Sequence, residues 1–231
     1  MFSSNKTLNI LLLGDSGVGK TTIVNTIVGT EHYFMKDEYV PTIGVDFRTR
    51  YPNDTSIMGT EFYWDTAGSH HYFSVTKEYY KDKKIVIFVY DKTNINSLYN
   101  IEHWIKHFID VNKTKHIHFI LLENKADKDE TPENIETRIL LAKSYIEKYS
   151  MSYFSISCKH RHTLDKVITH IEKLYNYPNL LSNRDEIKEN TNIPSLNNQN
   201  DIDTESSSLT CLDSLFMYMS LAFSCCCGCR R

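Results

Sequence analysis

The sequence lacks a surplus of positive charge and contains few residues that interrupt regular structure. Its 26 lysines and arginines face 29 aspartates and glutamates, which gives a formal net charge of −3, and it holds only 8 glycines and 5 prolines in 231 residues. This balance is not that of a nucleic-acid-binding surface, so we expect no nucleic-acid partner. The hydrophobic fraction of 41% is sufficient for one well-filled domain with an appendage.

Signals for secretion, N-myristoylation and disulfide bonding are lacking as well. The first apolar run, residues 8–13, is too short for a signal peptide, and Phe2 stands where N-myristoylation needs glycine. Four of the six cysteines crowd into the last seven residues, which is not the spacing of a disulfide framework. We therefore expect a cytosolic protein whose thiols are reduced.

One glycine-rich motif lies between an apolar run and a stretch with helical periodicity. Residues 14–21 read G-x-x-x-x-G-K-T, the pattern of a phosphate-binding P-loop. Its glycines allow backbone N–H groups to converge on phosphate oxygens at the N-terminus of the helix that follows. Lys20 would reach the β- and γ-phosphates, and the Thr21 hydroxyl would bind Mg²⁺. The expected phosphate-binding residues are Ser16, Gly17, Val18, Gly19, Lys20, Thr21 and Thr22.

The first 177 residues alternate between strand and helix patterns. Apolar or alternating runs predict strands at 8–13, 45–51, 57–64, 84–91, 117–122 and 151–156. Helical spacing predicts helices at 22–28, 94–112, from 131 onward and at 164–175, whereas 31–41 reads as a loop and 69–83 as a mobile, aromatic-rich stretch. This order predicts an α/β fold with a mostly parallel sheet and helices on both faces, whose ligands bind at the carboxyl ends of the strands.

Further polar motifs follow predicted strands. They are Asp65-Thr66-Ala67-Gly68, Asn124-Lys125-Ala126-Asp127 and Ser157-Cys158-Lys159. For residues 124–127 alone, a generic acidic loop is the alternative. With the P-loop and Thr42, however, the ordered set resembles the Ras superfamily of small GTPases over about residues 7–177. Within it, the stretches Ile43–Phe47, Trp64–Gly68, Tyr79–Lys81 and Phe88–Asp91 resemble the Rab family.

The resemblance implies a small G domain of the P-loop NTPase type, with a six-stranded sheet, that binds GTP or GDP with Mg²⁺. Thr21 and Thr42 would then hold Mg²⁺ through their hydroxyls and Asp65 through a water, since this hard cation prefers oxygen ligands. Gly68 has no side chain, so its N–H can approach the γ-phosphate. The catalytic residues for GTP hydrolysis would be Lys20, Thr42 and Ser69.

The same resemblance assigns the recognition of guanine to the two later motifs. Asp127 would accept hydrogen bonds from the guanine N1–H and exocyclic amine, a pattern that adenine does not offer. Asn124 would tie its loop to the P-loop, the Lys125 stem would cover the base, and the backbone N–H of Cys158 would bind O6. The expected base-binding residues are Asn124, Lys125, Asp127, Ser157, Cys158 and Lys159.

Some positions depart from the family pattern. Ser69 stands where most relatives carry the glutamine that orients the attacking water. His70 and His71 could substitute for that glutamine, but we favour the interpretation that both are solvated residues of the switch. Met35 occupies a position that is usually aromatic and packs on guanine, and either Met35 or Phe34 could fill that role. Glu123 replaces a small residue, and nothing in the sequence explains it.

His103 and His107 have the i, i+4 spacing of metal ligands on a helix. Trp104 follows His103 where a general-base glutamate would stand, and no third ligand is evident. We therefore interpret the pair as a solvated or half-buried helix face.

The end of the chain changes composition twice. Residues 178–210 are polar and predict a disordered, hypervariable linker, whereas 211–231 are apolar and rich in cysteine and predict a membrane-anchoring tail. Relatives carry two geranylgeranyl chains on paired cysteines near the end of the chain, and here Cys226, Cys227 and Cys229 are the candidates. Arg230 and Arg231 follow these cysteines, unlike the C-terminal cysteines of the usual prenylation motif. Palmitoylation of the same cysteines is therefore an alternative. The apolar stretch is shorter than the roughly 20 residues of a spanning helix. Cys226 and Cys229 could also be half of a zinc site, but the second ligand pair is missing.

These observations predict a monomeric guanine-nucleotide switch that hydrolyses GTP slowly. GTP would order residues 31–42 and 67–83, termed here the first and second switch segments. Effectors, an exchange factor and a GTPase-activating protein would bind through them, in vesicle traffic at the cytosolic face of intracellular membranes, with cycling to the cytosol. The alternative is a nucleotide-bound scaffold that does not hydrolyse GTP, and Ser69 is the feature that favours it.

Overall fold

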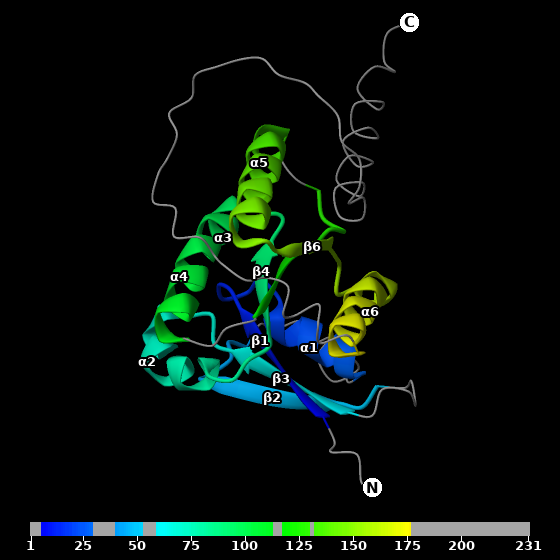
Figure 1. Ribbon diagram of the computed structural model, residues 1–231. Helices are drawn as coiled ribbons and strands as arrows, with labels where there is room; N and C mark the ends of the chain where they lie inside the picture. Colours follow the sequence, from blue (N-terminus) through cyan, green and yellow to red (C-terminus); the bar gives the residue numbers. More distant parts are fainter. Residues whose placement is uncertain (1–5, 30–39, 53–58, 113–116, 130–131, 177–231) are drawn as a thin grey trace, which may run out of the picture. The chain divides into compact units, whose positions relative to one another are not determined.

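The computed structural model describes residues 6–29, 40–52, 59–112, 117–129 and 132–176 (Figure 1). All of them belong to one compact unit, residues 1–187, while a second unit, residues 188–231, lies outside the described residues. The predicted linker and anchoring tail therefore remain predictions. In the described part of the chain, no helix is both long and apolar enough to cross a membrane.

A six-stranded sheet in the order β2-β3-β1-β4-β5-β6 forms the centre of this unit. Its strands are β1 (Lys6–Leu13), β2 (Val45–Arg50), β3 (Gly59–Thr66), β4 (Ile85–Asp91), β5 (His118–Asn124) and β6 (Ser152–Ser155). Every neighbouring pair is parallel except β2 and β3, which are antiparallel. The mostly parallel sheet and the edge position of β2 confirm the predicted fold. Because β4 and β5 are buried throughout, their apolar runs are unbroken.

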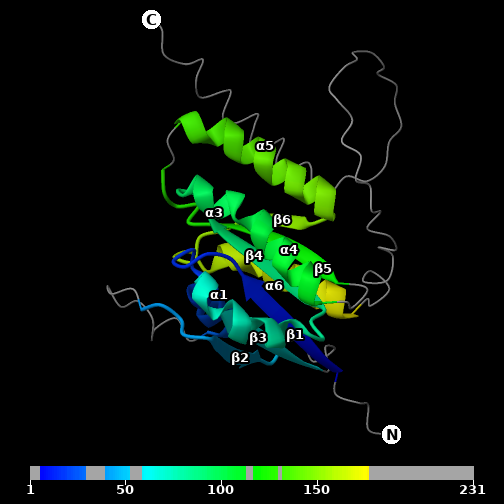
Figure 2. The same ribbon diagram turned by 90° about the vertical axis from the view of Figure 1, so that its left-hand side faces the viewer.

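Helices cover both faces of the sheet (Figures 1 and 2). They are α1 (Lys20–Val28), α3 (Ile95–Tyr99), α4 (Ile101–Val111), α5 (Pro132–Tyr149) and α6 (His162–Asn176). Alternation along β1 sends Ile10 and Leu12 into a core with α1 and α6, and Leu11 and Leu13 into a second core with α3, α4 and α5. Both cores thereby hold the carboxyl ends of β1, β4 and β5 in fixed positions.

One prediction about local structure was wrong, and one segment has helices that were not predicted. The predicted helix at 94–112 is divided into α3 and α4 at Asn100, whose side-chain amide donates to Asp15 of the P-loop over 2.7 Å. Residues 70–80, expected to be mobile, form three short helices: η2 (His70–Tyr72), α2 (Phe73–Thr76) and η3 (Lys77–Tyr80). Thr76 and Tyr80 of this segment are buried, and Phe73 packs against rings of α4.

Candidate functional site

The P-loop runs from the end of β1 to the start of α1 and requires glycine at two positions. Gly19 has φ +103°, and a Cβ there would lie 2.3 Å from Asn124 Nδ2. Gly14 has φ +142°, and a Cβ there would lie 2.2 Å from the Val89 carbonyl oxygen. Helix α1 begins after Gly19 without a side-chain cap, so its first N–H groups are available to an anion.

Lys20 lies beneath this loop with its ammonium group buried. Its Nζ donates to the carbonyl oxygens of Gly14 at 2.7 Å and Asp15 at 2.8 Å. Burial lowers the pKa of Lys20 to about 8, against the opposing attraction of Asp65 and Asp15. An anion bound by the loop would favour the charged form of Lys20, as expected for a phosphate ligand.

Three predicted Mg²⁺ ligands converge from separate segments. Thr21 Oγ1 lies 2.9 Å from Thr42 Oγ1 and donates to Asp65 Oδ2 at 2.6 Å, and Thr42 Oγ1 donates to the same oxygen at 3.3 Å. Burial raises the pKa of Asp65, although the hydrogen bond from Thr21 and the charge of Lys20 oppose this. The other carboxylate oxygen, Oδ1, is buried without a hydrogen-bond partner among the described residues. This set of oxygens fits a hard divalent cation such as Mg²⁺.

The second switch segment lies directly against the P-loop at Gly68. A Cβ on Gly68 would lie 2.3 Å from both the Asp15 carbonyl carbon and the Ser16 nitrogen, so no other residue fits there. Ser69 follows at the start of η2, where its side chain makes no capping hydrogen bond. The Ser69 side chain is therefore not held by the helix that it begins.

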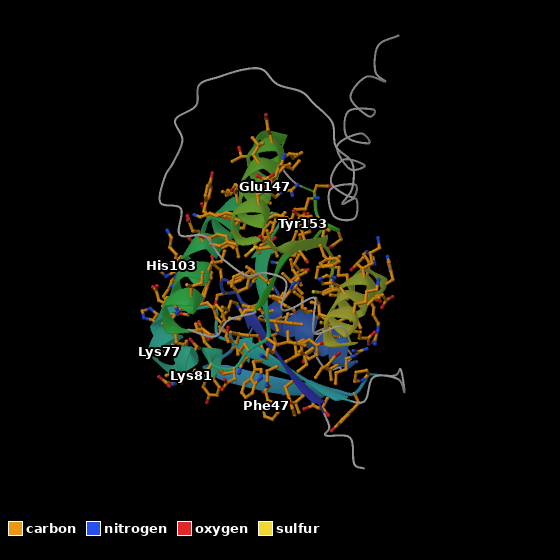
Figure 3. The ribbon with its side chains drawn as sticks, in the orientation of Figure 1. Phe47, Lys77, Lys81, His103, Glu147 and Tyr153 are labelled. Carbon is orange, nitrogen blue, oxygen red and sulfur yellow. The ribbon has the colours of Figure 1, made fainter. Side chains whose placement is uncertain are left out.

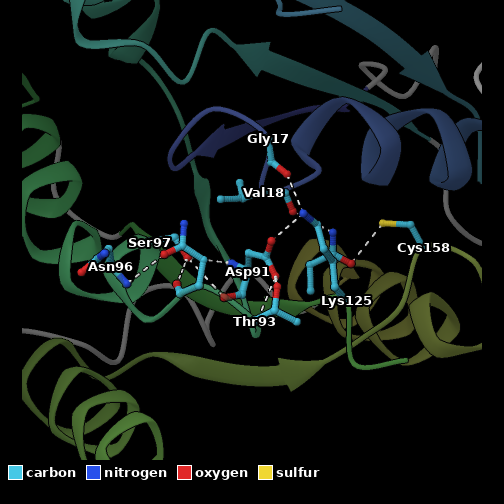
Figure 4. A network of polar contacts seen from close by, with 10 residues as sticks. Gly17, Val18, Asp91, Thr93, Asn96, Ser97, Lys125 and Cys158 are labelled. Atoms are coloured by element: carbon cyan, nitrogen blue, oxygen red, sulfur yellow. Dashed lines mark hydrogen bonds and ion pairs between the residues drawn. The ribbon is translucent and has the colours of Figure 1, made fainter. Parts of the chain in front are cut away.

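A pocket of about 210 Å³ lies where β5 and β6 end. It is lined by Thr22, Asn124, Lys125, Asp127, Lys128, Ser157, Cys158 and Lys159, of which only Lys128 was not predicted. Asn124 makes the expected tie to the P-loop, because its Nδ2 donates to the Val18 carbonyl at 2.8 Å. Cys158 Sγ donates to Asn124 Oδ1 at 3.3 Å and thereby fixes the orientation of the amide (Figure 4).

Asp127 is held by two residues of the loop after β6. Ser157 Oγ donates to Asp127 Oδ1 at 2.6 Å, and Lys159 Nζ lies 3.0 Å from Oδ2. The hydrogen bond from Ser157, followed by that from Lys159, lowers the pKa of Asp127 to about 2. The carboxylate is therefore ionised at neutral pH and can accept hydrogen bonds from two adjacent donors of a ligand.

Lys125 crosses from this pocket to the P-loop (Figure 4). Its Nζ donates to the Gly17 carbonyl at 2.9 Å and to Asp91 Oδ2 at 2.5 Å. Burial tends to raise the pKa of Asp91, but hydrogen bonds from Lys125 and Thr93 lower it overall. Asp91 was missed as a site residue, although its place at the end of β4 was a signal that it belongs to the same edge of the sheet.

Comparison with known proteins agrees with this geometry. The sequence profile of the Ras family matches residues 9–176. The Ras-related protein RABE1e of Arabidopsis thaliana is 30% identical over 169 residues, covering 72% of this chain and 73% of the relative. The Ypt/Rab-type GTPase YPT7 of Saccharomyces cerevisiae is 33% identical over 135 residues, 57% of this chain and 64% of the relative. The Ras-related protein Rab-27B of Bos taurus is 28% identical over 197 residues, 81% and 85% of the two chains. The chain belongs to the Rab family of small GTPases.

In this Rab protein, His70 is exposed, as expected of a solvated switch residue, and its ring also packs on neighbouring aromatic side chains. Its imidazole stacks on Trp104 of α4, with ring centroids 5.5 Å apart, and meets the edge of Phe73 at 4.7 Å. The sequence left open whether His70 substitutes for the missing glutamine, and in the structure its ring packs against α4. His71 is exposed as well, as expected.

The helix face carrying His103 and His107 is occupied by packing. Both imidazoles stack on Phe73, at centroid distances of 5.6 Å and 4.2 Å, and His107 is half-buried. Within the described ranges, no three or more histidine, cysteine, aspartate or glutamate side chains are grouped so that they could hold a metal ion. The interpretation as an exposed to half-buried helix face agrees with both observations.

An aromatic row joins β2 and β3 to the second switch segment of this Rab protein. Trp64 of β3 lies between Phe47 and Tyr79, at centroid distances of 5.6 Å and 5.7 Å, and Lys83 Nζ lies 4.2 Å from the Trp64 ring centre. Phe47, on the outer side of β2 in Figure 3, is 52% exposed, and Tyr79 is 39% exposed. Exposed aromatic side chains of this kind are typical of protein-binding surfaces.

Several predicted residues lie outside the described part of the chain. These are Phe34 and Met35, together with the tail cysteines Cys226, Cys227 and Cys229.

Proposed function

We propose that this Rab protein is a guanine-nucleotide switch that binds GTP and GDP with Mg²⁺. The observation that carries the proposal is the pocket at the ends of β5 and β6, where Asp127 is ionised and held by Ser157 and Lys159. Asn124 and Lys125 join this pocket to the P-loop, so a base in the pocket would place its phosphates at the start of α1. Asp127 would select guanine, and the N–H of Cys158 would bind O6.

The switch itself would depend on the cluster of Thr21, Thr42 and Asp65. Bound Mg²⁺ neutralises part of the phosphate charge. Thr42 belongs to the first switch segment and Gly68 to the second, so both segments would be drawn toward a γ-phosphate and released when it is lost. The backbone contact between Gly68 and the P-loop supports this role.

Hydrolysis would be slow without a partner. Lys20 and Thr42 would stabilise the transferring phosphoryl group, but Ser69 is too short to hold the attacking water as glutamine does. The imidazole of His70 stacks on Trp104, which favours a packing role for it over that of holding the water. A GTPase-activating protein that provides the missing groups in trans would restore the rate.

The cellular role would be the recruitment of effectors in vesicle traffic. The row of Phe47, Trp64 and Tyr79 runs from β2 to the second switch segment and is suited to effector recognition. Lipid on Cys226, Cys227 and Cys229 would attach the monomer to the cytosolic face of intracellular membranes, and the soluble form would cycle through the cytosol.

The second candidate is a nucleotide-bound scaffold that does not hydrolyse GTP, and Ser69 is the observation that favours it. Nucleotide analysis of the purified protein, followed by single-turnover hydrolysis with and without cell extract, separates the two. Bound GDP and a measurable rate that extract accelerates support the switch. Retained GTP without turnover, even in extract, supports the scaffold, and absence of any guanine nucleotide contradicts both.

A further inference from the structure

Glu123 places a buried carboxylate directly before the base-binding loop. The residue is 3% exposed and is the last but one of β5, next to Asn124. Its side chain accepts hydrogen bonds from Tyr90 Oη at 2.6 Å and Ser155 Oγ at 2.8 Å, and it forms a hydrogen-bonded ion pair with Arg138. A buried carboxylate of this kind is stable only because its oxygens are paired and hydrogen-bonded.

The donors come from three elements that surround β5. Tyr90 belongs to β4, Ser155 to β6 and Arg138 to α5. Burial raises the pKa of Tyr90 well above its ordinary value, with Tyr153 and Glu123 adding to the effect, so Tyr90 remains a neutral donor. Tyr153 of β6, below α5 in Figure 3, packs against the same core. One side chain thus connects β4, β6 and α5 at a single point.

This point lies immediately behind the candidate base pocket. Glu123 is in register with Tyr90 and Ser155, and its carbonyl accepts from Ile156 N at 2.8 Å. The chain then continues from β4 into Asp91, from β5 into Asn124, and from β6 into residues 157–159. The two pocket-lining segments at the ends of β5 and β6 therefore begin within two residues of the Glu123 network, although Glu123 itself does not line the pocket.

We propose that the Glu123–Arg138 pair is a positioning device that holds the base-binding loops in place and slows the release of guanine nucleotide. Buried ionic groups contribute little net stability compared with apolar residues, but they can fix one arrangement of the elements they join. Loss of one partner would leave a buried charge unpaired, and the strand ends would shift to solvate it. The inference rests on the proposed function, because it concerns the same nucleotide.

The test uses the full chain loaded with fluorescent GDP and Mg²⁺. Glu123→Gln and Arg138→Met should each accelerate GDP dissociation by about tenfold or more. Single-turnover hydrolysis of preloaded GTP should stay unchanged, since the phosphate residues lie at β1, α1 and β3 and make none of these contacts. If the Glu123–Arg138 pair only stabilised the fold, its loss would change GDP dissociation and GTP hydrolysis together.

A matched control breaks a second buried ion pair away from the pocket. Arg50 of β2 pairs with Glu61 of β3 at 2.9 Å, near the opposite edge of the sheet, and with Glu172 of α6 at 2.8 Å. Arg50→Met should lower the melting temperature as Arg138→Met does, while GDP dissociation keeps its wild-type rate. Equal acceleration by Arg50→Met would show a general loss of stability and would overturn the proposal.

Other outcomes are equally decisive. If Glu123→Gln and Arg138→Met release GDP within about twofold of wild type, Glu123 is a packing residue only. If either variant does not fold, Ser155→Ala removes one hydrogen-bond donor to Glu123 with less disturbance. This variant should still accelerate GDP release severalfold. An unchanged rate of GDP release would contradict the proposal. Wild-type protein that fails to bind labelled GDP would overturn the proposed function instead, so the two failures are distinguishable.

Discussion

Trp104 Nε1 donates a hydrogen bond to Asp15 Oδ1 over 2.8 Å, and the same indole ring carries the stacked imidazole of His70. Asn100 Nδ2 donates to the other oxygen of Asp15 at 2.7 Å. The start of α4 therefore connects the P-loop to the second switch segment through one fully buried ring.

Trp104→Phe should lower the free energy of unfolding by about 2–4 kcal/mol, because it removes buried ring area and leaves Asp15 Oδ1 without its donor. Urea denaturation measures the effect. Tyr99→Phe, on the neighbouring helix α3, alters an exposed side chain and serves as the control with an unchanged midpoint. A midpoint for Trp104→Phe equal to that of wild type would show that the indole hydrogen bond contributes nothing.

Ser69→Gln should accelerate intrinsic GTP hydrolysis by roughly tenfold, which corresponds to about 1.4 kcal/mol of barrier and is within reach of one orienting contact. His70→Ala should leave the rate nearly unchanged, because the imidazole packs on Trp104. Single-turnover rates of the three proteins give the comparison. If His70→Ala is much slower than wild type while Ser69→Gln is not faster, His70 positions the water.

GDP affinity should fall as the pH rises above about 8, the lowered pKa of Lys20. A bound phosphate favours charged Lys20 and raises its pKa, so the complex holds one proton more than the free protein between the two pKa values. Binding is therefore at full strength below the lower pKa and weakens above it. Lys20→Arg cannot titrate in this range, and titrations between about pH 7 and pH 9 should show a shallower slope for it. Identical slopes for wild type and Lys20→Arg would show that the titration of Lys20 does not cause the pH dependence of GDP affinity.

Changing Cys225, Cys226, Cys227 and Cys229 together to serine should release the protein from membranes to the soluble fraction. The linker holds no cluster of basic residues that could bind anionic lipid in place of covalent lipid. Fractionation followed by a carbonate wash measures the distribution. Retention of the quadruple variant in the washed membranes would favour a spanning segment over a lipid anchor.

The sequence carried the fold and most of the candidate site because both depend on local patterns. Alternation and apolar runs located β1 to β6, and the motifs at 14–21, 65–68 and 124–127 follow strand ends, which a parallel sheet brings to one edge. Asn124 could be expected to reach the P-loop for the same reason.

What could not be predicted depends on contacts between distant residues. Glu123 had no explanation until Arg138, Tyr90 and Ser155 were found around it. The helices at 70–80 and the division at Asn100 likewise involve packing on α4 and the bond to Asp15, neither of which has a local signal. Periodicity describes which face of an element is buried, but not which side chain it meets.

The most direct test of the central claim is nucleotide competition for wild type and Asp127→Asn, with labelled GDP or labelled xanthosine diphosphate as the reporter. Asp127 is ionised and accepts hydrogen bonds, so wild type should prefer guanine and ignore adenine nucleotides. The asparagine amide instead donates toward the extra carbonyl of xanthine, so the variant should lose GDP and gain xanthosine diphosphate. Equal competition by ADP and GDP for wild type, or an unchanged preference in Asp127→Asn, would contradict the assignment of this pocket to guanine.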